Sequence, residues 1–238
     1  MSRAEQERRT MADTSESLTT RVDGPADAAA VLILAHGAGA AMDTPFMDTF
    51  AQGLAEAGIR SVRFEFPYMA ERRTSGRRRP PDREPVLRAT WHQAIAQVCE
   101  TLKPRQRLFI GGKSMGGRIA SLIAAEQQAA RPIAGLVCLG YPFHPPGKPQ
   151  ATRIAHLEEI ATPTLIVQGE RDPFGTRAEV AAYRLSPQVT LHWLTDGDHS
   201  FKPRKKSGAT EEGNLREGVE AVVAFCQSIL QADRGRAG

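Results

Sequence analysis

The chain has 238 residues, of which 41% are hydrophobic and 24% are charged, which is the composition of an ordinary soluble globular domain. At this length the core is large enough to need neither disulfides nor a structural metal, and single α/β domains of about 200–250 residues are common. The net charge is only +4 and aromatic residues make up 6%, which argues against a general nucleic-acid binder.

No stretch of the sequence resembles a membrane or secretory segment. The longest apolar run, residues 28–35, is much shorter than the about 20 residues of a membrane helix, and the first ten residues are charged rather than apolar. Three scattered cysteines form no C-x-x-C pair and are expected to be free thiols. We therefore expect a cytoplasmic protein that has no membrane partner.

Strands and helices are predicted to alternate along most of the chain. Residues 1–27 are polar and predict a disordered or weakly structured tail with one short strand at 18–22. A single domain is expected over 28–231, followed by a C-terminal tail over 232–238. Further strands are predicted at 31–35, 59–66, 107–111, 133–139, 164–168 and 189–194, and helices at 45–58, 86–102, 116–128, 156–159, 177–184 and 214–230. Segments 67–84 and 141–150 are predicted loops.

This alternation predicts a doubly wound α/β fold, with a mostly parallel sheet of about six strands and helices on both faces. The proline-rich loop 141–150 contains no amphipathic helix, so we expect no cap domain and an open site unsuited to long acyl chains. Ligands of such sheets bind at the carboxyl ends of the strands. The residues that follow each strand are therefore the candidates for catalysis.

A nucleophile motif follows the predicted strand at 107–111. Gly112-Lys113-Ser114-Met115-Gly116 matches G-x-S-x-G, in which a tight turn between a strand and a helix lifts the serine hydroxyl away from the sheet. Such a serine needs a histidine base, and the base needs an acid that orients it. In this fold the acid precedes the histidine along the chain.

Two later strands end in residues that fit these roles. Asp172 follows the strand at 164–168 and His199 follows the strand at 189–194, so Ser114, Asp172 and His199 are the predicted catalytic residues. We favour Asp172 because a loop after the penultimate strand can reach the histidine. The other acids in the two loops, which more plausibly shape the turns, are Glu170, Asp196 and Asp198.

Small residues after the first strand of the domain predict an oxyanion hole. In His36-Gly37-Ala38-Gly39-Ala40 the backbone can approach a substrate oxygen, so the amides of Ala38 and Met115 are the predicted donors, and His36 is expected to brace the loop. Two nucleotide-binding motifs are incomplete, because Arg107 replaces the first P-loop glycine and Met42 the third small residue of a dinucleotide fingerprint. No cluster has metal-ligand spacing, so we predict no metal and no cofactor.

Two loops carry the positive charge. Residues 71–84 contain six arginines and three acids, and 202–206 contain four basic residues, so the rest of the chain is net acidic. Both loops follow strands and are expected at the edge of the sheet that carries Ser114. They are either solvated loops or a positive rim that attracts an anionic substrate. The candidate substrate-binding side chains are Phe143, His144 and Lys202.

These motifs together resemble the α/β-hydrolase superfamily over the chain after residue 28. The segments AHGAGA, RFEFPYM, GGKSMGGR, GYPFHPPGKP, QGERDPFG and DGDHSFKPRKKSG are similar to a small branch, the dienelactone-hydrolase-like KANL/Tex proteins. The resemblance implies a serine hydrolase fold with Ser114, Asp172 and His199 at the triad positions, and it names no substrate. Dienelactone hydrolases themselves carry cysteine at the elbow, so lactone chemistry does not follow.

Two functions remain open from the sequence. The first is a serine hydrolase of an ester or related small acyl substrate, of carboxylesterase or thioesterase type, that acts through the triad and the backbone oxyanion hole. The second is a non-catalytic binding module on the same fold that uses its basic loops. Reaction with a fluorophosphonate probe distinguishes them.

Overall fold

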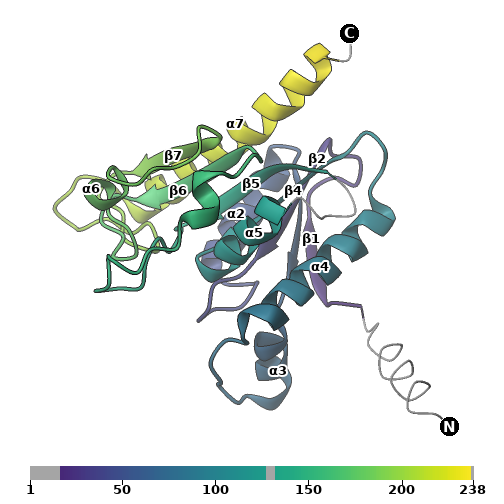
Figure 1. Ribbon diagram of the computed structural model, residues 1–238. Coiled ribbons are helices and arrows are strands. Elements are labelled where there is room, and N and C mark those ends of the chain that lie inside the picture. The colour runs from purple at the N-terminus through teal and green to yellow at the C-terminus, as the bar shows by residue number, and fades with distance from the viewer. Residues whose placement is uncertain (1–16, 127–131, 237–238) are drawn as a thin grey trace.

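A seven-stranded sheet forms the centre of the computed structural model, which describes residues 17–126 and 132–236 (Figure 1). The spatial order of its strands is β1-β3-β2-β4-β5-β6-β7. Strands β2 to β7 pair in parallel, and β1 pairs with β3 antiparallel at one edge. Their bounds are β1 Thr20–Asp23, β2 Ala30–Ala35, β3 Arg60–Phe64, β4 Arg107–Lys113, β5 Ile133–Leu139, β6 Thr164–Gly169 and β7 Val189–Leu194.

Helices cover both faces of the sheet (Figure 1). Helices α2 (Pro45–Glu56) and α7 (Glu211–Arg236) pack on one face, and α4 (Glu84–Thr101) and α5 (Met115–Glu126) pack on the other. Strand β2 shows why two cores form, since residues 31, 33 and 35 join the α4 and α5 side while residues 30, 32 and 34 join the α2 and α7 side. A run of apolar residues covered on both faces is typical of a central parallel strand.

The predicted doubly wound α/β fold is confirmed, with seven strands rather than about six. The seventh strand is β1, which corresponds to the short strand predicted at 18–22 within the segment 1–27. It is tied to the domain by its ladder with β3 and by Leu18, whose backbone N–H donates to Gln97 Oε1 over 2.8 Å. At the other end, α7 continues through Arg236 into the predicted tail 232–238. Residues 1–16 and 237–238 lie outside the described residues.

The predicted loop 67–84 contains a helix, α3 (Pro67–Ser75). Proline at the first helical position suits a helix start, and Gly76, with φ of 68°, ends it in the left-handed conformation. The segment reads as a loop in the sequence because it is rich in arginine and buries only Tyr68 and Met69. Its first turn is held by Asp82, whose Oδ2 accepts from the Tyr68 N–H over 2.9 Å.

The segment between β5 and β6 carries no cap domain. It consists of loop and a single 3₁₀ turn, η1 (Ala155–Glu158), and the short helix α6 (Arg177–Val180) comes only after β6. The carboxyl ends of the strands are therefore covered only by loops in this part of the chain. In the described ranges, none of the helices combines the length and the hydropathy that a membrane crossing needs.

Candidate active site

Ser114 lies in the turn between β4 and α5, and its backbone is strained. Its φ is 49°, in the left-handed region that non-glycine residues rarely adopt. The turn is also tightly packed, because a Cβ on Gly112 would lie 2.3 Å from the Ala35 carbonyl oxygen, and one on Gly116 would lie 2.5 Å from that of His36. The two glycines of G-x-S-x-G are thus required by the close approach of β2, as expected for a nucleophile elbow.

A continuous chain of hydrogen bonds connects Ser114, His199 and Asp172. His199 Nε2 lies 2.9 Å from Ser114 Oγ, and His199 Nδ1 lies 2.8 Å from Asp172 Oδ2. A carboxylate only accepts, so Nδ1 carries the proton and donates it to Asp172. Nε2 is then free to accept the hydroxyl proton of Ser114, which is the arrangement that activates a serine as a nucleophile.

Asp172 is fixed by its surroundings. Its side chain is fully buried, and besides His199 it accepts from Gln168 Nε2 over 3.0 Å and from the Phe174 backbone N–H over 2.9 Å. The Phe174 ring also packs against the imidazole, with ring centroids 4.3 Å apart. Gln168 was not singled out from the sequence, because a glutamine at the end of a strand gives no signal of which side chain it supports.

The rival acids are engaged elsewhere. Glu170 accepts from Arg177 over 2.7 Å and from the Asp196 backbone N–H over 3.0 Å, and these bonds lower its pKa. Arg204 lowers the pKa of Asp196 to about 2 through its side-chain hydrogen bonds. Asp198 accepts from backbone N–H groups in its own turn. Asp172 is thus the acid that the structure brings to His199.

The loop after β2, residues 36–44, is named here the β2 loop, and it lies against the elbow, since a Cβ on Gly37 would be 3.7 Å from Ser114 Cβ. Among the described residues, no loop or turn hydrogen bond uses the backbone N–H of Ala38 or that of Met115, the first residue of α5. Both groups can therefore donate to a substrate. Tyr68 Oη donates to the Ala38 carbonyl over 2.9 Å, and His36 Nε2 accepts from the Phe66 N–H over 3.1 Å. The other ring nitrogen of His36 therefore donates to the Gly37 carbonyl, 2.7 Å away.

His36 thus acts as a brace in the β2 loop. Burial lowers its pKa, which favours the neutral imidazole that these two hydrogen bonds require. A brace rather than a proton carrier is what the sequence predicted for this residue.

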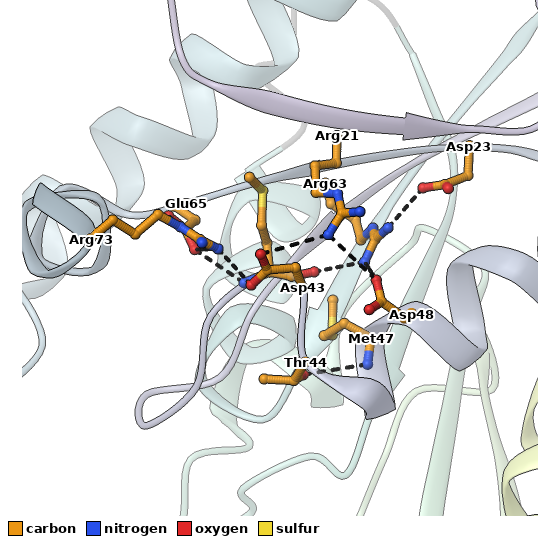
Figure 2. A network of polar contacts seen from close by, with 10 residues as sticks. Arg21, Asp23, Asp43, Thr44, Met47, Asp48, Arg63, Glu65 and Arg73 are labelled. Carbon is orange, nitrogen blue, oxygen red and sulfur yellow. Dashed lines mark hydrogen bonds and ion pairs between the residues drawn. The ribbon is translucent and has the colours of Figure 1, made fainter.

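A network of ion pairs holds the far end of the β2 loop (Figure 2). Arg63 is almost fully buried, and its guanidinium reaches Asp23 at 2.8 Å and Asp48 at 2.5 Å and donates to the Met42 carbonyl over 2.8 Å. Glu65 accepts from the Met42 N–H over 3.2 Å. Arg73 of α3 bridges Glu65 and Asp43. The loop that carries Ala38 is therefore clamped to β1, β3, α2 and α3.

A second serine and histidine pair lies in the interior. Ser121 Oγ is 2.7 Å from His156 Nε2 and 2.7 Å from the Arg118 carbonyl oxygen, and Ser121 is fully buried. The carbonyl only accepts, so the single hydroxyl proton lies toward it and His156 donates to the serine. Burial, with a contribution from Arg118, lowers the pKa of His156 to about 4. This histidine is a donor, so it cannot serve as a base for Ser121.

The three predicted substrate-binding side chains differ in burial and in their contacts. Phe143 is fully buried and packs against Tyr141 and Tyr183, with ring centroids 4.9 and 5.8 Å apart, so it supports the fold instead. His144 is 2% exposed, and its Nδ1 lies 2.8 Å from the Pro145 carbonyl oxygen. Lys202 is exposed and pairs with Glu211 at 3.2 Å.

Four of the ten basic side chains in the two charged loops, including Lys202, form ion pairs with described residues. Arg73 and Arg79 pair with acids at 2.6–3.2 Å, and Arg204 pairs with Asp196 at 2.5 Å. These pairs reduce the charge of the positive rim that was one of the two alternatives for the loops. A groove of about 1030 Å³ between α2 and α7 is lined by residues other than the triad. Within the described residues, no group of three or more His, Cys, Asp or Glu side chains is arranged to hold a metal ion.

Comparison with known proteins decides the family. Residues 28–227 match the alpha/beta hydrolase domain. The chain belongs to the α/β-hydrolase family. This confirms the superfamily that the motifs indicated and agrees with the sheet order and the elbow described above.

Solved structures of other α/β-hydrolases share the fold with low sequence identity. Dienelactone hydrolase from Anabaena variabilis is 21% identical, with 90% of this chain and 93% of that chain covered and a TM-score of 0.68. An alpha-beta serine hydrolase homologue from Coxiella burnetii is also 21% identical, with 86% and 89% covered and a TM-score of 0.60. Est1E from Butyrivibrio proteoclasticus is 16% identical, with 90% and 95% covered and a TM-score of 0.64. At these sequence identities the similarity shows a shared fold only.

Proposed function

We propose that this α/β-hydrolase is a serine hydrolase of an ester or related small acyl substrate. The observation that carries the proposal is the chain of hydrogen bonds from Ser114 through His199 to Asp172, with lengths of 2.9 and 2.8 Å. The strained backbone of Ser114 supports the same role, because strain of this kind is typical of functional sites.

In the proposed reaction the Ser114 oxygen attacks the acyl carbonyl carbon while His199 Nε2 takes the hydroxyl proton. The negative charge that develops on the carbonyl oxygen is stabilised by the backbone amides of Met115 and Ala38. The imidazolium gives its proton to the leaving group, which departs and leaves an acyl-serine ester. Water then attacks this ester with the same histidine as base, which releases the acid and restores Ser114.

The segment between β5 and β6, which carries no cap domain, supports a preference for short acyl groups. A long acyl chain needs an extended apolar tunnel, and the described residues that follow β5 form a loop instead. We therefore propose that hydrolysis of acetate and butyrate esters exceeds that of long-chain esters. Four of the ten basic side chains of the charged loops are paired with acids, and we propose no requirement for an anionic substrate.

The experiment compares two serine variants. Wild-type protein is incubated with p-nitrophenyl acetate and with a fluorophosphonate probe, and the two variants are Ser114→Ala and Ser121→Ala. Ser121 is the matched control, since it also lies within hydrogen-bond distance of a histidine but is fully buried. We expect Ser114→Ala to abolish both reactions and Ser121→Ala to retain them.

Two results would contradict the proposal. If the wild type neither labels nor hydrolyses any ester of a panel of short acyl groups, the non-catalytic binding module becomes the better account. If Ser114→Ala still labels, the nucleophile is another residue.

A further inference from the structure

Lys113 contacts three segments of the candidate active site. It is the last residue of β4, directly before Ser114, and its Nζ donates a hydrogen bond to the backbone carbonyl of His199. Its aliphatic stem lies against the β2 loop, since a Cβ on Gly37 would be 3.5 Å from the Lys113 Cγ. One side chain therefore joins the nucleophile strand, the histidine turn and the loop that presents Ala38.

The ammonium group of Lys113 is surrounded by aromatic rings rather than by a paired acid. Nζ lies 5.1 Å from the ring centroid of Phe46 and 5.2 Å from that of Phe201, within the range of cation–π contacts. The described residues provide no ion pair to it. Burial lowers the pKa of Lys113 to about 8, and this effect is opposed by the more distant carboxylates of Asp172 and Asp198.

The space for this ammonium depends on Gly140, the residue after β5. A Cβ at position 140 would lie 2.5 Å from Lys113 Nζ and 3.1 Å from the His199 carbonyl oxygen. Any side chain at this position would therefore displace the ammonium from the carbonyl. Gly140 also has a φ of 66°, which any other residue would adopt only with strain.

Among the described residues, Lys113 alone donates a hydrogen bond to the His199 carbonyl oxygen. Without it, His199 itself would keep its imidazole contacts to Asp172, Ser114 and the Phe174 ring, and its backbone would be held only through the hydrogen bonds of the neighbouring residues Asp198 and Phe201. We infer that Lys113 is a positioning residue that fixes the His199 backbone relative to Ser114. The inference rests on the proposed function in one respect, that His199 serves as the base.

The test removes the ammonium in two independent ways. Lys113→Met keeps the length of the stem without the charge, and Gly140→Ala displaces the ammonium while Lys113 is retained. Gly58→Ala is the matched control, because Gly58 has a φ of 76° and no atom within 4 Å of a built Cβ, at the turn between α2 and β3. It introduces the same kind of strain away from the site.

We expect Lys113→Met and Gly140→Ala each to slow fluorophosphonate labelling of Ser114 by about 10- to 100-fold, because small displacements of a reacting group cost about this much in rate. Gly58→Ala is expected to label at nearly the wild-type rate. The added Cβ also lies 3.4 Å from His199 Nδ1, so Gly140→Ala can perturb His199 directly as well. The double variant Lys113→Met/Gly140→Ala should be little slower than Gly140→Ala alone, since the ammonium contact is already lost in that variant.

A second measurement does not depend on catalysis. The His199 Nδ1 proton that is hydrogen-bonded to Asp172 should give a far-downfield proton NMR resonance, assigned by its loss in His199→Ala. We expect it in the wild type and in Gly58→Ala, and broadened or lost in Lys113→Met and Gly140→Ala. If the wild type does not label at all, the proposed function fails and this resonance alone decides the role of Lys113. A Lys113→Met protein with the wild-type labelling rate, or with the wild-type resonance where labelling is absent, would overturn the inference.

Discussion

Replacing Arg63 by Met should destabilise the protein substantially, because Arg63 is 1% exposed and is the centre of the network in Figure 2. The change leaves the Met42 carbonyl and the carboxylates of Asp23 and Asp48 without their shared partner. Breaking a buried ion pair costs about 3–5 kcal/mol. Here the two carboxylates are 30% and 33% exposed and regain some hydration, so we expect a loss of about 2–3 kcal/mol.

For a domain of this size about 1 kcal/mol shifts the Tm by about 2–4 °C, so the expected fall for Arg63→Met is about 5–10 °C. Thermal unfolding followed by circular dichroism measures it. Arg60→Met is the matched control, since Arg60 lies on the same strand, is half-buried and has no ion pair to a described residue. Equal Tm values for the two variants would refute this account of the network.

Three further predictions concern the elbow, the triad and a buried histidine. Gly116→Ala should lower the Tm and abolish labelling, because the added Cβ would lie 2.6 Å from the Ala35 carbonyl oxygen. Asp172→Asn should lower kcat by about 10⁴, since an amide at this position favours the wrong tautomer of His199. The pKa of His156 is lowered to about 4, so the folded state binds fewer protons than the unfolded state between pH 4 and about 6.5. Stability should fall as the pH falls through this window, and less so in His156→Gln.

Each of these predictions has an opposing outcome. A Gly116→Ala protein that labels at the wild-type rate would mean that the elbow tolerates a side chain. An Asp172→Asn protein within about tenfold of the wild-type kcat would leave another acid to orient the imidazole. Urea unfolding of the wild type and His156→Gln at a series of pH values checks the third prediction, and parallel stability curves would contradict it.

The parallel sheet and the positions of the three triad residues could be predicted because their signals are local. Buried parallel strands appear as continuous apolar runs, such as residues 30–35, and the residues that follow each strand meet at one edge of the sheet. The order of the acid and the histidine along the chain and their positions after strands predict both residues, and the structure connects both to Ser114.

What could not be predicted depends on tertiary contacts. Helix α3 was not predicted because Arg73 is held by Glu65 and Asp43, partners that lie 8 and 30 residues away in the sequence. Lys113 reads as the variable residue of G-x-S-x-G, and its contact with the His199 carbonyl spans 86 residues. The loop after β5 suggested that Phe143 contacts a ligand, whereas its ring packs in the core.

The most direct test of the central claim locates the covalent adduct itself. Wild-type protein is reacted with a fluorophosphonate, digested, and its peptides are sequenced by mass spectrometry. We predict a single phosphonate on Ser114, which is lost when His199 is replaced by Ala, and an unmodified Ser121 in the same digest. An adduct on any other residue, or no adduct on a folded protein, would contradict the account of Ser114 as an activated nucleophile.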